Sequence, residues 1–162
     1  MRTHITIVTA AMLLSAPAFA QAVSTDEFVK KVAISDMFEV QSSKLALQKQ
    51  PDVDTKPFAQ KMTKDHTKTT NELTRLVRSG KVRAELPTAL DGEHQGKLDQ
   101  LKGLSGKDFD RAYDQAQLEG HQKAVALFEQ YAQGGDNPQL KTWAAKTLPH
   151  LKQHLAMAQK LK

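Results

Sequence analysis

Apolar residues recur every three to four positions along most of the chain from residue 25 onward, which is the period of an amphipathic α-helix. No stretch of the sequence alternates apolar and polar residues with the two-residue period of a β-strand. Capping residues, glycines and prolines divide the helical pattern into four long segments and one short segment. The pattern therefore predicts an all-α fold.

The first two long helices are bounded by clear start and stop signals. Residues 24–27 read Ser-Thr-Asp-Glu, which is the form of a capping box, so a helix should begin near Thr25 and run to about Gln50. Pro51 ends it. A second helix should follow Asp54 and end at Ser79, because Gly80 can adopt the left-handed conformation that closes a helix.

The second half of the chain predicts a connection and two further long helices. Asp91 can cap a short helix that runs to about Leu101. A third long helix should begin near Ser105 and stop at residues 134–135, which are both glycine. Pro138 opens a fourth long helix that reaches the C-terminus and is kinked or broken near Pro149.

The lengths of the links predict how these helices are arranged. Four helices of about 25 residues are each about 37 Å long, which suits a bundle. Short links make the first two helices one antiparallel pair and the last two another. The long link over residues 81–106 can traverse the bundle. We therefore expect a ferritin-like four-helix bundle with one long crossover connection that carries a short extra helix.

The N-terminal residues have the pattern of a targeting segment. Arg2 precedes an apolar run from Ile5 to Ala16, and the small residues of Ala18-Phe19-Ala20 suit a signal peptidase. The alternative, a membrane anchor, needs a run of about 20 apolar residues, and this run is shorter. We expect residues 1–20 to be a cleaved secretory signal, residues 21–162 to be one domain, and the protein to be periplasmic or secreted.

Composition removes several kinds of chemistry. The chain has 162 residues, a formal charge of +5 and no cysteine. The lack of cysteine excludes disulfides, thiol nucleophiles and thiolate metal sites. Nucleophile elbows, phosphate-binding loops and dinucleotide-binding glycine patterns are also absent from the sequence. We predict no catalytic residue.

Polar side chains interrupt the inward stripe of each long helix near its middle. Glu39, His66, His121 and His154 each lie about 12 to 16 residues into their helices, so they should lie near one level of the bundle. Buried carboxylates and imidazoles are costly unless they pair with one another, enclose water or hold a cation. A shared polar belt follows from this placement.

The belt has two readings. In the first, Glu39, His66, His121 and His154 are ligands of a zinc, copper or iron ion. Asp36 and Asp65 are then further ligands or orient the imidazoles, and His150, one turn before His154, is a further donor. In the second reading the belt is a hydrogen-bonded network that fixes helix register in a structural or envelope-stress interaction protein.

Charge suggests one further partner. Five basic residues share the outward arc of the second helix: Lys61, Lys64, Lys68, Arg75 and Arg78. They could contact an anionic envelope polymer, although such a stripe is usually only solvated. Aromatic residues are not interleaved with these charges, so nucleic acid is not expected as a partner.

Four segments carry a family resemblance: FAQKMTKDH at residues 58–66, LPTALDGEHQGKLDQL at 86–101, GKDFDRAYDQAQLEGHQKAVALF at 106–128 and TLPHLKQHL at 147–155. They resemble the bacterial exported family called domain of unknown function 4142. This resemblance implies a ferritin-like fold and gives emphasis to Asp65, His66, His121, Pro149 and His154. The Glu-x-x-His pairs of di-iron bundles are absent from the sequence, so ferroxidase chemistry is not expected.

Overall fold

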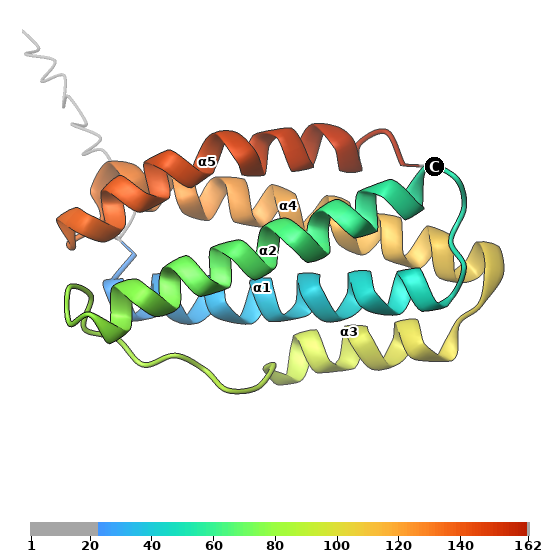
Figure 1. Ribbon diagram of the computed structural model, residues 1–162, viewed down its shortest axis with the longest axis horizontal. Helices are drawn as coiled ribbons and strands as arrows, with labels where there is room; N and C mark the ends of the chain where they lie inside the picture. The colour runs from blue at the N-terminus through green and yellow to red at the C-terminus, as the bar shows by residue number, and fades with distance from the viewer. Residues whose placement is uncertain (1–22, 162) are drawn as a thin grey trace, which may run out of the picture.

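The computed structural model describes residues 23–161, which form helices and no strand (Figure 1). The helices are α1 (Thr25–Gln48), α2 (Thr55–Arg78), α3 (Gly92–Gly103), α4 (Gly106–Gly134) and α5 (Pro138–Ala158). The predicted all-α bundle is therefore confirmed. The expected signal segment, residues 1–20, lies outside the described residues. None of the helices within residues 23–161 combines the length and apolar composition that a membrane span requires.

The four long helices pack as two antiparallel pairs, α1 with α2 and α4 with α5 (Figure 1). The short helix α3 lies along α1 and carries the chain from one end of the bundle back to the other. As a result α2 and α4 run in the same direction. The connection between them, which contains α3, is the single long crossover that the link lengths predict.

Local signals explain most of the helix boundaries. The Ser24 hydroxyl accepts a hydrogen bond from the Glu27 amide at 3.2 Å, as the capping-box pattern predicts. The Asp91 carboxylate accepts in the same way from the His94 amide at 2.9 Å. Gly80 follows α2 with a φ of 74°, a conformation that favours glycine.

Of the kink or break expected near Pro149, the break does not occur, because α5 is one continuous helix through this residue. Proline has no amide hydrogen, so the carbonyl of Ala145 loses its regular helical donor. Ala144 and Leu151 are buried on either side of this point and hold both halves of α5 against the bundle. Tertiary packing thus outweighs the local cost of the proline.

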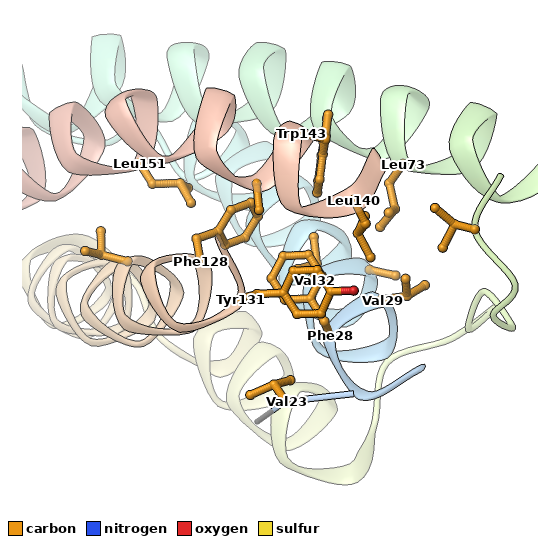
Figure 2. Close-up of a cluster of buried hydrophobic side chains, with 14 residues drawn as sticks. Val23, Phe28, Val29, Val32, Leu73, Phe128, Tyr131, Leu140, Trp143 and Leu151 are labelled. Atoms are coloured by element: carbon orange, nitrogen blue, oxygen red, sulfur yellow. The ribbon is translucent and has the colours of Figure 1, made fainter. Parts of the chain in front are cut away.

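The apolar core consists of two separate clusters, one toward each end of the bundle. Figure 2 shows the cluster in which Phe28 stacks on Tyr131, with ring centroids 4.0 Å apart, and packs beside Phe128 and Trp143. The second cluster contains Phe38, Phe58, Met62, Phe109 and Tyr113. Burial of these aromatic side chains fixes the helices at both ends.

Buried polar residues fill the level between the two clusters. They are Asp36, Glu39, Ser42 and Ser43 of α1, His66 of α2, Gln117 and His121 of α4, and His154 of α5. The predicted polar belt is therefore present, with every long helix contributing to it.

A separate buried carboxyl lies where the loop between α1 and α2 meets α4. Asp114 is 7% exposed, and its Oδ1 accepts a hydrogen bond from the Thr55 hydroxyl at 3.2 Å. The pKa of Asp114 is raised from 3.8 to about 6, mainly by burial, with a smaller contribution from the nearby charges of Asp52 and Asp110 and an opposing one from the Thr55 hydrogen bond. The ionised form of Asp114 therefore destabilises the fold near neutral pH.

Asp114→Asn should stabilise the protein at pH 7 by about 1–3 kcal/mol, because the amide still accepts from Thr55 but carries no charge. The gain should fall as pH drops below about 6, be small near pH 4, and vanish about one pH unit below 3.8, where Asp114 is protonated in both the folded and unfolded states. Urea unfolding of both proteins at several pH values measures this. A gain that persists unchanged at pH 4 would contradict the explanation.

Candidate metal centre

Three imidazoles from three helices meet in the polar belt. His66 of α2, His121 of α4 and His154 of α5 have ring centroids 5.5 Å apart in all three pairs. Each residue is at most 3% exposed. One nitrogen of each ring lies within 4.8 Å of a nitrogen of both others, and among residues 23–161 no other group of histidines and acids converges in this way.

One nitrogen of each ring is held by a hydrogen bond. His66 Nδ1 lies 2.7 Å from Asp36 Oδ1, His121 Nδ1 lies 2.8 Å from the Gln117 carbonyl oxygen, and His154 Nε2 lies 2.9 Å from Asp65 Oδ2. A carbonyl can only accept, so His121 Nδ1 carries the proton and donates it. When the ring holds only this proton, its second nitrogen, Nε2, is unprotonated.

The same reasoning applies to His154. Partial burial raises the pKa of Asp65, but hydrogen bonds from Lys61 and His154 outweigh it and leave this pKa below its usual value. Asp65 is thus an ionised acceptor, so His154 Nε2 donates. Burial lowers the pKa of His154 to about 4, which keeps the ring neutral at pH 7 and leaves Nδ1 unprotonated.

The proton between Asp36 and His66 can lie on either group. Burial raises the pKa of the Asp36 carboxyl well above its usual range and lowers the pKa of His66 to about 4, so without a metal a protonated Asp36 donates to Nδ1 and the ring proton of His66 lies on Nε2. When Asp36 is ionised, Nδ1 donates to its carboxylate instead and Nε2 is unprotonated. A positive ion at Nε2 favours this state, because it stabilises the ionised Asp36 nearby.

The remaining nitrogen of each ring has no hydrogen-bond partner among the described residues. These atoms are His66 Nε2, His121 Nε2 and His154 Nδ1, and each is buried from solvent. A buried acceptor without a donor costs about 1–3 kcal/mol. Three such atoms in one place indicate that the site is built for something that accepts electron pairs from all of them.

The spacing suits a transition-metal ion. An ion centred in a triangle with 4.8 Å sides lies about 2.8 Å from each corner, and metal–imidazole bonds are about 2.0–2.1 Å long. Movement of each ring by less than about 1 Å closes this difference. The three imidazoles therefore fit an ion that prefers nitrogen ligands, with an orienting group behind each ring.

Glu39 lies beside this group without belonging to the convergent set. It is 2% exposed, its Oε2 has no partner within the described part of the chain, and its charge raises the pKa of His66. Gly120 makes room for it, since a Cβ at this position would lie 3.1 Å from Glu39 Oε1. Glu39 thus supplies negative charge next to the imidazoles.

The other expected residues have different positions. Asp36 and Asp65 lie behind histidines and orient them, which is one of the two roles predicted for them. His150 is exposed, so it does not join the buried group. In the basic stripe, Lys61 pairs with Asp65 and Lys68 with Glu72, so acids of α2 offset part of its charge.

Sequence reasoning missed the acceptor behind His121. The Gln117 backbone oxygen carries no side-chain signal, and only its position four residues before His121 could have suggested it. His121 and His154 are both buried, in agreement with their predicted place in the polar belt.

Comparisons with known proteins agree with this architecture. The sequence model of a family described as domain of unknown function, DUF4142, matches residues 10–161. Among curated proteins, no sequence matches the chain.

Two solved structures share the fold, and both are of CopM. Its Cu(II)-bound form has a TM-score of 0.69 and 15% sequence identity, and the match covers 85% of this chain and 94% of that one. Its Cu(I)-bound form has a TM-score of 0.65 and 19% identity, with the same coverage. At these identities the likeness establishes the fold alone.

His121→Leu should leave the metal-free protein at least as stable as the wild type, with a gain of about 1–2 kcal/mol. Leucine fills a similar volume and removes a buried nitrogen that has no donor. The Gln117 carbonyl keeps its backbone donor in α4. Urea unfolding in the presence of a chelator measures the change, and the surface variant His150→Leu should stay within about 0.5 kcal/mol. A clear loss of stability in His121→Leu would contradict the cost assigned to this nitrogen.

Proposed function

We propose a function for this chain, which belongs to the DUF4142 family: it binds one transition-metal ion through His66, His121 and His154. The observation that carries this proposal is the convergence of three buried nitrogens without donors. Glu39 would add negative charge or a fourth donor, as the sequence predicts. Asp36, Asp65 and the Gln117 carbonyl would hold the rings in position.

The alternative reading, a purely structural network, accounts less well for this arrangement. A network that only fixes helix register would satisfy its own donors and acceptors. Here the hydrogen bonds of the three rings are made by one nitrogen of each, while the other nitrogen of each ring has no partner. In an interaction protein without a metal, three buried nitrogens without partners would lower stability and serve no purpose.

We propose copper as the preferred ion, ahead of zinc and iron. Imidazoles suit all three metals, and among divalent ions copper has the highest affinity for a given nitrogen or oxygen site. The solved structures that share this fold are of CopM with copper bound, which supports the same choice. The ligand set offers no thiolate, because the chain has no cysteine.

We further propose that the protein holds metal outside the cytoplasm, as a buffer rather than as an enzyme. The histidines are almost fully buried, so a bound ion would be surrounded by protein. Support for export comes from the signal-like sequence of residues 1–20.

The wild-type protein, purified without a histidine tag, should bind one equivalent of copper. A ligand at 100 times its dissociation constant adds about 2.7 kcal/mol to folding stability, which thermal melting detects. His66→Ala, His121→Ala and His154→Ala should each abolish stoichiometric binding, because two imidazoles remain. Glu39→Gln should weaken binding by about tenfold. Elemental analysis and isothermal titration measure these effects.

His94→Ala is the matched control, since this half-buried histidine of α3 lies outside the convergent group. It should bind copper as the wild type does. If no metal binds the wild type, or if His66→Ala and His121→Ala bind as tightly as it does, the proposed site is wrong.

The protein recovered from the bacterial envelope fraction should begin at Gln21, because the predicted cleavage follows Ala20. N-terminal sequencing and the mass of the intact chain measure this. An uncleaved chain that remains in the cytoplasmic fraction would contradict the proposed export.

A further inference from the structure

The buried histidines border a pocket between α2 and α5. This pocket has a volume of about 180 Å³ and is lined by both His66 and His154. Liquid water occupies about 30 Å³ per molecule, so the pocket has room for roughly six waters or for one hydrated ion. It therefore offers a route from solvent to two of the three candidate ligands.

His150 also lines this pocket, and it is exposed to solvent. It lies four residues before His154 in α5, so the two side chains are neighbours on one face of the helix. An imidazole that reaches solvent on one side and the pocket on the other is placed to meet an arriving ion before the buried ligands do.

Charges at this pocket are balanced and do not repel a cation strongly. Lys61 Nζ lies 2.8 Å from Asp65 Oδ2, and Lys68 Nζ lies 3.9 Å from Glu72 Oε1. Two cations therefore stand beside two carboxylates among the lining residues. Because the lysines are protonated, they have no electron pair to offer a metal ion. His150 is the exposed residue of this pocket that offers a nitrogen ligand.

A second and larger pocket, of about 730 Å³, reaches the polar belt from α1 and α4. His66 is the only one of the three convergent histidines that lines it, and Asp36 and His94 line it as well. The smaller pocket thus gives access to more of the site.

We propose that metal ions reach the three-histidine site through the pocket between α2 and α5, and that His150 binds each ion transiently on its way. This inference rests on the proposed metal binding and adds the route by which the ion is exchanged. A transient ligand lowers the barrier in both directions, so it speeds loading and release by the same factor. It leaves the equilibrium affinity unchanged.

Stopped-flow mixing of the full-length, metal-free protein with Cu(II) ions tests this route. Trp143 is the sole tryptophan of the chain and lies in α5, about 16 Å along the helix from His154. Quenching of its fluorescence by paramagnetic copper reports loading, and release into excess chelator reports the reverse step. In His150→Ala, both rate constants should fall about tenfold, a barrier increase of about 1.4 kcal/mol. The dissociation constant from titration should stay within about twofold of wild type.

His94→Ala provides the matched control, because it removes a histidine from the larger pocket instead. Its loading rate should equal that of the wild type. His150→Gln should load as slowly as His150→Ala, since a neutral amide restores polarity without an imidazole. Thermal melting of the metal-free variants checks that each one is folded.

Three outcomes would overturn the route. Loading by His150→Ala at the wild-type rate would remove the role of His150, and slow loading by His94→Ala alone would place the route in the larger pocket. A loss of equilibrium affinity in His150→Ala would make His150 a permanent ligand. Wild-type protein that binds no Cu(II) would instead contradict the proposed function itself, before any variant is compared.

Discussion

Three buried imidazoles face one another in the centre of the bundle, and one nitrogen of each has no hydrogen-bond partner among the described residues. They cannot move apart, because apolar clusters on both sides fix the helices that carry them. They also cannot rotate freely, since Asp36, Asp65 and the Gln117 carbonyl each hold one ring. The unpartnered nitrogens therefore lower the stability of the metal-free protein. A cation bound by them would remove this cost and stabilise the folded state.

The crossover topology makes this convergence possible. Because α3 returns the chain along the bundle, α2 and α4 run in the same direction while α5 runs against them. His66 and His121 lie near the middle of α2 and α4, whereas His154 lies four residues before the end of α5, the shortest of the four long helices. The three residues nevertheless reach one level of the bundle. The orienting groups come from three different helices. A site assembled in this way depends on the whole fold rather than on any local motif.

The sequence was sufficient for the architecture and for the level of the polar belt. Caps and loop lengths are local signals that can be read from the sequence. Ser24 and Gly80 predicted where α1 begins and α2 ends, and the long link predicted the crossover. Ring orientation was not predictable, since it depends on partners such as the Gln117 carbonyl that have no sequence signature. Pro149 does not cause a break in α5, which was one of the two outcomes expected there, because packing of Ala144 and Leu151 outweighs its local cost.

Anomalous diffraction at the copper absorption edge, from crystals of the copper-loaded protein, tests the central claim most directly because it locates the ion without reference to affinity. The account predicts one strong peak at bonding distance from Nε2 of His66, Nε2 of His121 and Nδ1 of His154. A peak confined to exposed histidines such as His150, with the three buried rings unchanged and no density between them, would contradict it.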